Sequence, residues 1–166
     1  MFMQIQLCVK ITINLVFRNN DSELLMIQEA KQHSRGMWFL PAGKGKEGEL
    51  ITDTCIRETT EESGVTTKPI YLLRTEHIIR NIHLDKDDER KPVDIFRFIF
   101  VSQALDNNLK TVETKDSIQA KWIPVEEVKN LPLRSIEVLN YIESYQQQKK
   151  RNSLAQLDDI LDVYND

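Results

Sequence analysis

Residues 43–65 constrain the fold of this chain more than any other stretch, because they place three glutamates at the spacing of one helix face. Glu58, Glu61 and Glu62 stand at positions i, i+3 and i+4, so on a helix their carboxylates project from one narrow strip. The same count places packing side chains beside or within that strip, at Ile51, Cys55 and Thr59. The sequence therefore predicts a helix whose acidic strip borders its packed side rather than open solvent.

Three carboxylates at the edge of a core need a partner of opposite charge. Like charges at this spacing repel, and burying uncompensated carboxylates costs free energy. Residues 43–65 contain six acidic and three basic side chains, a local charge of -3. A hard cation such as Mg²⁺ removes both penalties, since it binds carboxylates together with substrate phosphates. The alternative is an acidic face that is merely solvated, as most glutamate-rich helix faces are.

The register of the whole stretch favours the metal-binding interpretation. Gly43 is followed after five residues by Glu49, and then after seven residues by the run RETTEESGV at 57–65. This arrangement resembles the signature of the Nudix hydrolases. Thr59 stands where that family usually has an aliphatic residue, and a β-branched threonine can still pack there.

The resemblance implies a metal site and a catalytic group on the predicted helix. The ligands it implies for Mg²⁺, with Mn²⁺ as a second candidate ion, are Glu58, Glu61, Glu62 and the Gly43 carbonyl. Arg57 would hold the neighbouring glutamates through a bidentate contact that a lysine could not reproduce. Either Glu58 or Glu61 would be the general base for the attacking water, and the sequence does not decide which. Glu49 is expected to brace the loop.

Outside this stretch the chain is similar to one Nudix branch, the 8-oxo-guanine nucleoside diphosphatases. The matching segments cover most of residues 9–145 and lie at 24–31, 35–43, 97–100, 109–111, 116–122 and 131–134. The branch implies an enzyme that cleaves 8-oxo-(d)GDP to 8-oxo-(d)GMP and phosphate and so sanitises the nucleotide pool. The chain departs from this branch in the charged segment 81–92, which is longer than expected.

Two other functions stay open at this point. One is a Nudix pyrophosphatase for another nucleoside diphosphate derivative, such as a triphosphate, a sugar-linked nucleotide or an RNA cap. The other is a Nudix domain without catalysis that binds a nucleotide or a protein partner. The complete set of glutamates argues against the second, because a binding module gains nothing from a costly acidic cluster.

Substrate contacts are less constrained than the metal site. The candidates are Arg35, Phe39 and Asp116. Phe39 suits stacking on a purine, as do the aromatic residues at 96, 98 and 100, but aromatic side chains at alternating strand positions are more often core. Asp116 suits the edge of a guanine or an outer metal ligand, against the alternative of an exposed loop acid. Arg35 suits a phosphate, against plain solvent exposure.

Length and composition fit one soluble domain. The chain has 166 residues, of which 40% are hydrophobic and 29% charged, enough to bury a core without disulfides. A net charge of -4 argues against a nucleic-acid polymer as partner, so a small-molecule nucleotide is expected. Two cysteines and the lack of a long apolar run predict no disulfide framework, no membrane span and a cytoplasmic location. The oligomeric state cannot be read from these residues.

Periodicity along the chain predicts an α/β fold. Strands are expected at 5–17, 23–29, 37–40, 70–79, 93–101 and 118–123, and helical segments at 49–63, 125–130 and 133–148. Gly64 is expected to stop the first helix, and the segment 81–92 to form a loop. Strands on both sides of the acidic helix in sequence favour a mixed sheet covered by helices.

The resemblance makes this expectation more specific, as the Nudix-type α/β/α sandwich. It places the Nudix domain at residues 1–148, followed by a polar tail at 149–166. Within that tail, the spacing of the apolar residues allows a short amphipathic helix. These residues are Leu154, Leu157, Ile160, Leu161 and Tyr164.

Overall fold

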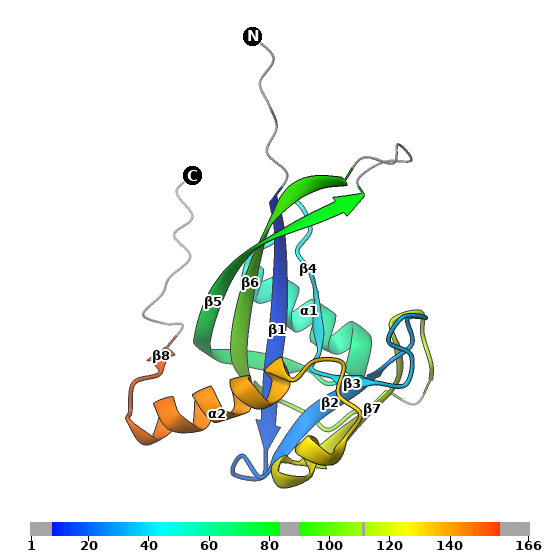
Figure 1. The fold of residues 1–166 in the computed structure, drawn as a ribbon. Helices are drawn as coiled ribbons and strands as arrows, with labels where there is room; N and C mark the ends of the chain where they lie inside the picture. The colour runs from blue at the N-terminus through cyan, green and yellow to red at the C-terminus, as the bar shows by residue number, and fades with distance from the viewer. Residues whose placement is uncertain (1–7, 84–89, 111, 157–166) are drawn as a thin grey trace.

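A mixed eight-stranded sheet forms the centre of the molecule (Figure 1). The structure is a computed structural model and describes residues 8–83, 90–110 and 112–156. Strands β3, β2, β1, β6, β5 and β8 follow one another across the sheet, while β4 pairs with β1 and β7 with β2. Strands β1 and β6 pair in parallel, and the other described pairs are antiparallel. The bounds are β1 Cys8–Arg18, β2 Glu23–Glu29, β3 Trp38–Phe39, β4 Ala42–Lys44, β5 Thr67–His83, β6 Arg90–Ala104, β7 Ser117–Pro124 and β8 Ala155–Gln156.

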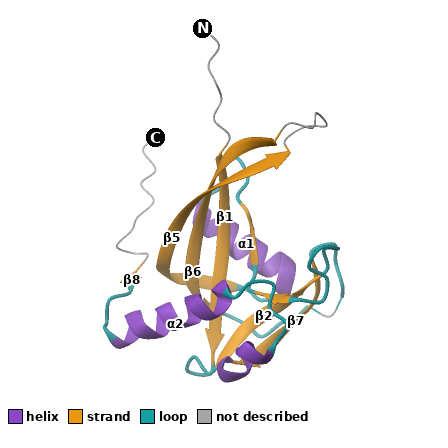
Figure 2. Cartoon of the chain, in the orientation of Figure 1, coloured by secondary structure: helices purple, strands orange, loops and turns teal. Residues whose placement is uncertain are grey.

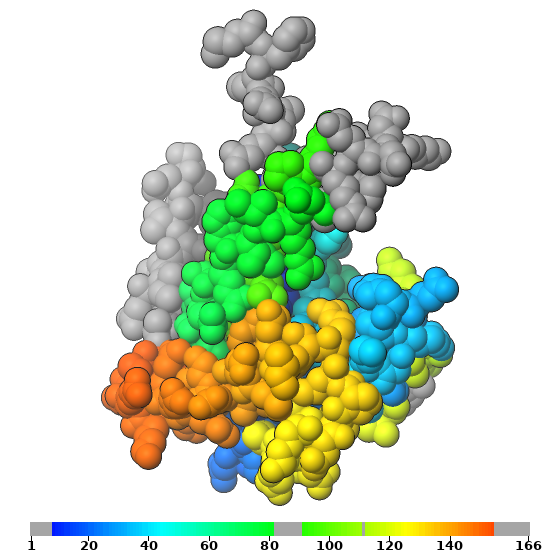
Figure 3. All heavy atoms as spheres, in the orientation of Figure 1, coloured from blue at the N-terminus to red at the C-terminus, as the bar shows by residue number. Residues whose placement is uncertain are grey.

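Two helices cover opposite faces of this sheet (Figure 2), which confirms the predicted α/β/α sandwich. Helix α1 (Ile51–Ser63) lies on one face. Helix α2 (Glu137–Lys150) lies on the other, next to the 3-10 helix η1 (Val125–Asn130), and both are visible on the face shown in Figure 3. None of the helices in the described part of the chain is long and apolar enough to cross a bilayer.

Strand β1 lies in the middle of the sheet and is buried on both faces. Its residues Thr12 to Phe17 are all buried, as expected of a strand with a helix on each side. Leu15 belongs to the core cluster that α2 covers, together with Val138 and Tyr141. On the opposite face, Asn14 reaches α1. Pairing with β4 then fixes the strand that leads to the acidic helix.

Helix α1 ends where the sequence predicts, at Gly64. The glycine has φ of 83°, a left-handed conformation, and its N–H donates to the Thr60 carbonyl. A Cβ at this position would lie 2.5 Å from the Asn108 carbonyl oxygen, so the backbone of the loop between β6 and β7 also excludes a side chain. Glycine is therefore required both for the turn and for the close approach.

The predicted loop at 81–92 is wrong over much of its length. Strands β5 and β6 continue to the pair His83 and Arg90, and only residues 84–89 lie outside the described part. The ends of the two strands project beyond the helices as a hairpin (Figure 1). The sequence of residues 81–92 is largely charged, so it lacks the apolar alternation by which strands are predicted.

Three smaller differences concern short or terminal elements. Strand β4 was not predicted, because three residues are too few to show a period. Helix α2 begins at Glu137 rather than 133, since Leu133 bridges Trp38 and the Arg134 N–H donates to the Trp38 carbonyl. Strand β8, within the predicted tail, pairs with β5. The amphipathic helix expected at 154–164 falls mostly on residues 157–166, outside the described residues.

Candidate active site

Helix α1 is anchored to the sheet by a buried polar chain. Asn14 Nδ2 of β1 donates to Thr59 Oγ1 at 2.8 Å, and Ser102 Oγ of β6 donates to Asn14 Oδ1 at 2.6 Å. Thr59 Oγ1 in turn donates to the Cys55 carbonyl at 2.7 Å. Threonine at this position therefore accepts a hydrogen bond from the buried Asn14 Nδ2, which an aliphatic side chain could not do. These hydrogen bonds fix the rotation of helix α1 about its axis, and with it the direction in which the acidic strip points.

Glu62 is the most buried carboxylate of the acidic strip, at 5% exposure. Its Oε2 accepts a hydrogen bond of 2.8 Å from the Ala42 N–H in β4. Burial raises the pKa of Glu62 to about 8, and the nearby charges of Glu29 and Glu58 act in the same direction. Glu62 is thus held beside β4 in surroundings that disfavour its charge.

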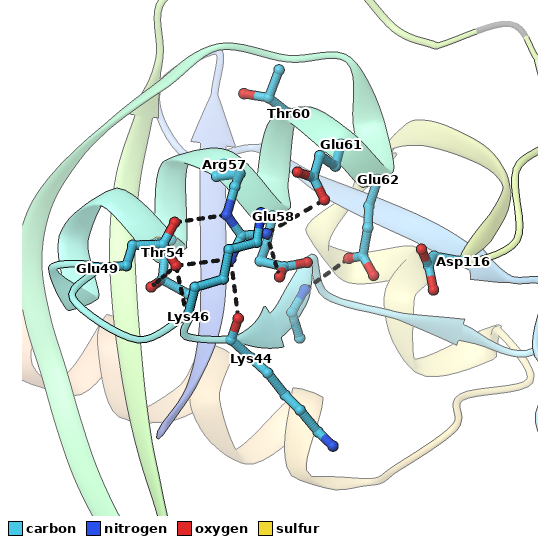
Figure 4. Close-up of polar contacts among 12 residues, drawn as sticks. Lys44, Lys46, Glu49, Thr54, Arg57, Glu58, Thr60, Glu61, Glu62 and Asp116 are labelled. Atoms are coloured by element: carbon cyan, nitrogen blue, oxygen red, sulfur yellow. Dashed lines mark hydrogen bonds and ion pairs between the residues drawn. The ribbon is translucent and has the colours of Figure 1, made fainter. Parts of the chain in front are cut away.

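Glu58 and Glu61 complete the strip in different surroundings (Figure 4). Glu58 is half-buried, and burial raises its pKa against the opposing effect of Arg57. The side chain of Glu61 is 55% exposed, and its one described ion pair, to Arg57, is 3.4 Å long. The structure therefore places all three glutamates on one side of α1, with Glu61 the most open to solvent.

Arg57 ties the helix to the loop before it. Its Nε and Nη2 donate to the two carboxylate oxygens of Glu49 at 2.7 and 2.9 Å, and its Nη1 donates to Glu58 at 2.6 Å. Nη2 also donates to the Lys44 carbonyl at 3.0 Å. The guanidinium, with further hydrogen bonds from the Lys46 N–H and the Thr54 hydroxyl, holds the pKa of Glu49 well below its usual range. Glu49 contacts the loop and not the cavity, in agreement with a bracing role.

Gly43 lies directly under the Glu58 carboxyl group. A Cβ on Gly43 would lie 1.9 Å from Glu58 Cδ and 2.1 Å from Oε2. No side chain fits between this backbone and Glu58. The absence of a Cβ thus brings the carboxylate of Glu58 against β4, where the resemblance expects the Gly43 carbonyl as a further ligand.

An open cavity of about 500 Å³ lies over the acidic strip. Its acidic lining residues are Glu58, Glu61 and Glu62 from α1 and Asp116 from the loop before β7. Ser117 Oγ donates to the Glu62 carbonyl at 2.7 Å, which docks this loop on α1. The lining also contains Arg57, which the sequence predicts at this site, and four lysines that the sequence analysis did not assign to it: Lys31, Lys44, Lys46 and Lys115. Their positions in three separate segments gave no pattern along the chain.

The three predicted substrate residues lie in different places. Asp116 lines the cavity and pairs with Lys31 at 3.4 Å. Arg35 is exposed outside the cavity lining and pairs with Glu113 at 2.8 Å. Phe39 is only 1% exposed, and the Arg134 guanidinium lies 3.7 Å from its ring centre. This burial argues against direct stacking of Phe39 on a base.

The donor set fits a hard divalent cation. Glu58, Glu61 and Glu62 offer carboxylate oxygens on one face, and their mutual repulsion and burial make a positive ion favourable. In the described residues no three acidic, histidine or cysteine side chains converge closely enough to form a ready-made cage. Instead, Arg57 donates to Glu58 and the Ala42 N–H donates to Glu62.

Residues 10–142 match the family described as NUDIX domain. This match spans more than half of the chain, so the chain belongs to the Nudix family. The predicted family is confirmed. The match includes the acidic helix, the cavity and the sheet that carries them.

Curated relatives include the 8-oxo-dGDP phosphatase NUDT18 of Mus musculus, 37% identical over 130 residues, and that of Homo sapiens, 36% identical over 140 residues. These alignments cover 77% and 81% of this chain but 36% and 39% of the relatives. The aligned part thus spans less than half the length of these two relatives. The names describe the activity of those relatives.

Solved structures agree with the fold. A NUDIX hydrolase from Nitrosomonas europaea has a TM-score of 0.71 at 22% identity and covers 94% of this chain and 97% of its own. The NUDIX domain of Shewanella oneidensis NrtR, solved with ADP ribose, has a TM-score of 0.63 at 20% identity and covers 89% and 90%. At these identities the likeness shows the fold alone.

Replacing Arg57 by lysine tests the bracing contact. We expect hydrolysis to fall about 10- to 100-fold, because an ammonium cannot bind both oxygens of Glu49 and Glu58 together. The control is Arg18→Lys, which removes an equally bidentate pair with Glu23 away from the cavity. Steady-state rates of the two variants would be compared. Equal rates in wild type and Arg57→Lys would contradict the role of the guanidinium.

The metal-free domain should lose stability as pH rises from about 4.5 to 8. In this window the folded state holds a proton on Glu62, whose pKa is raised to about 8, while the unfolded chain has lost it. Stability from this group is complete below pH 4.5 and is lost as pH rises through 8. Thermal unfolding in a chelator should show a smaller decline for Glu62→Gln than for wild type. If the stability of wild type and of Glu62→Gln declined equally with pH, Glu62 would be solvated in the folded domain.

Proposed function

We propose that this chain hydrolyses the diphosphate linkage of nucleoside diphosphates with the help of Mg²⁺, or of Mn²⁺ in its place. The proposed substrate is 8-oxo-(d)GDP, cleaved to 8-oxo-(d)GMP and phosphate. The observation that carries the proposal is the cavity in which Glu58, Glu61 and Glu62 face Asp116. The similarity to 8-oxo-dGDP phosphatases over about four fifths of the chain supports the choice of base.

Each residue of the acidic strip has a distinct role in this proposal. Glu58, Glu61, Glu62 and the Gly43 carbonyl would hold the ion, directly or through water. When bound, such an ion polarises a phosphate oxygen and lowers the pKa of a bound water. Arg57 keeps Glu58 oriented through its 2.6 Å hydrogen bond. The lysines around the cavity attract the anionic substrate and hold its outer phosphate oxygens.

Two residues remain candidates for the general base. Glu58 has a raised pKa, which suits proton transfer, but one of its oxygens is held by Arg57. Glu61 is more exposed and less firmly paired. The residue whose glutamine variant still binds the ion but no longer turns over is the base. Asp116 is proposed as an outer ligand of the metal ion or as a contact to the edge of the guanine.

A turnover panel with Mg²⁺ tests the proposed function. Wild-type protein would be given 8-oxo-dGDP, dGDP, dADP, 8-oxo-dGTP and ADP-ribose, and the released products would be quantified. We expect the highest kcat/KM for 8-oxo-dGDP, with no turnover in excess chelator. A higher kcat/KM for another compound would favour a Nudix pyrophosphatase with a different substrate. Binding of a compound without turnover would favour a Nudix domain without catalysis.

The proposal extends to the organisation and location of the protein. We propose that residues 1–148 form the Nudix domain and residues 149–166 a tail, part of which packs on the sheet through β8. The partner is a small nucleotide, with no nucleic-acid polymer or membrane, and the compartment is the cytoplasm. Location of a tagged full chain by microscopy would test the last point.

A further inference from the structure

A second, smaller cavity adjoins the acidic one. Its volume is about 90 Å³, and Ala42 lines both cavities. Its walls are isoleucines of β1, β5 and β6, and its polar side chains are Arg80, Arg97 and Arg134. No carboxylate is among its described lining residues. The polar side chains of this apolar cavity are thus hydrogen-bond donors alone, because arginine has no acceptor.

Arg97 has one donor that nothing in the described structure satisfies. Its Nη atoms bind Glu137 at 2.8 and 3.1 Å and also pair with Glu76, and its side chain is only 13% exposed. The buried Nε–H has no hydrogen-bond partner. A buried donor without a partner destabilises the folded state, and a ligand oxygen that accepted its hydrogen bond would remove that cost. This observation is independent of the acidic strip.

Arg134 connects the two cavities. It donates to Glu29 at 2.6 Å, and it lies over the face of Phe39. Glu29 in turn acts electrostatically on Glu62 of the acidic strip. Because Ala42 lines both cavities, a molecule with its diphosphate over the strip has the arginine-lined cavity next to it.

We propose that the arginine-lined cavity takes the edge of the nucleobase, and that Arg97 donates through Nε–H to an oxygen of that base. The inference rests on the proposed function for the position of the diphosphate. A guanine-type base carries an oxygen at C6, and its oxidised form carries a second at C8, so both present acceptors. Adenine presents an amino group at C6, which a lining of donors rejects. Arg80 is exposed, so its rotation can widen the opening for the ring.

Phosphate is the other ligand that arginines attract. The isoleucine walls argue against it, since an apolar surface leaves part of a phosphate neither hydrated nor hydrogen-bonded. A planar base, in contrast, buries its faces against such walls and exposes its polar edge to the arginines. The experiment therefore includes pyrophosphate as a separate probe.

The first test is the ratio of kcat/KM for 8-oxo-dGDP and dADP. Arg97→Lys keeps a positive charge for Glu76 and Glu137 but has no equivalent of Nε–H. We expect the ratio to fall about 10- to 100-fold, the range for losing a specific contact to a base edge. The matched control is Arg74→Lys on β5, which also pairs with Glu76 but does not line the cavity. Its ratio should equal that of wild type.

The second test does not depend on hydrolysis. Free 8-oxo-deoxyguanosine, deoxyadenosine and pyrophosphate would each be titrated into metal-free protein and followed by NMR. Wild type and Arg74→Lys should bind the oxidised nucleoside in preference to deoxyadenosine, and Arg97→Lys should lose the preference. If Arg97→Lys does not fold, Arg80→Gln at the exposed position replaces it and should also reduce the preference.

The outcomes separate the two proposals. Nucleoside preference without turnover of any diphosphate would remove the proposed function and keep the base-binding cavity. Turnover of 8-oxo-dGDP with unchanged ratios in Arg97→Lys and Arg80→Gln would remove the cavity assignment alone. Displacement of the nucleoside from the arginines by pyrophosphate would also overturn it.

Discussion

Replacing Glu62 by glutamine should lower metal-dependent hydrolysis by at least about 100-fold while the domain stays folded. Changes in residues that only support a metal ligand already cost 10- to 100-fold, so loss of a ligand charge should cost no less. The fold is spared because a carboxamide oxygen can still accept the hydrogen bond from the Ala42 N–H. Because the raised pKa keeps Glu62 protonated in the metal-free state below about pH 8, a neutral carboxamide changes the charge of that state little.

Glu58→Gln should give a similar loss of rate, and a third variant supplies the control. Asp53→Asn removes a carboxylate from the same helix at an exposed position outside the cavity lining. It should keep wild-type kcat/KM. Rates would be measured at saturating Mg²⁺, and folding by circular dichroism. Near-normal turnover in both Glu58→Gln and Glu62→Gln would remove the assignment of the acidic strip.

Replacing Gly43 by alanine should reduce activity at least about 10-fold with little loss of stability. The new methyl group would meet the Glu58 side chain at 1.9 to 2.4 Å and push the carboxylate away from β4. Since the displaced atoms belong to a flexible side chain, the cost in stability should stay within about 1 kcal/mol, the range of a partly exposed ion pair. Loss of rate then comes from a misplaced ligand.

A neighbouring glycine and a double variant make this prediction specific. Gly45→Ala is the matched control, because its Cβ would come no closer than 3.3 Å to Thr54 Oγ1. It should keep most of the activity. If Gly43→Ala acts through Glu58, adding it to Glu58→Gln should cause little further loss. Additive losses would show that Gly43 acts independently of Glu58.

The acidic strip was predictable because it is local. Glu58, Glu61 and Glu62 lie within one turn of a helix, so their spacing alone places them on one face. The end of the helix at Gly64 was predictable for the same reason. Neither prediction needed to know how distant segments pair.

The second cavity was not predictable because the sheet assembles it. Arg97 and Arg134 come from separate elements, and each is paired with a distant glutamate. Their proximity to Ala42 follows from the strand order, which no pattern along the chain encodes. Phe39 shows the converse: an aromatic residue in a strand fits both a core and a ligand site, and only its burial separates the two.

The most direct test of the acidic strip as a metal site is a crystal structure of the chain with Mg²⁺ and a non-hydrolysable analogue of 8-oxo-dGDP. We predict an ion bound between the diphosphate and oxygens of the three glutamates at 58, 61 and 62, at the short distances typical of Mg²⁺. Those side chains turned outward, with the nucleotide and ion bound elsewhere, would contradict the account.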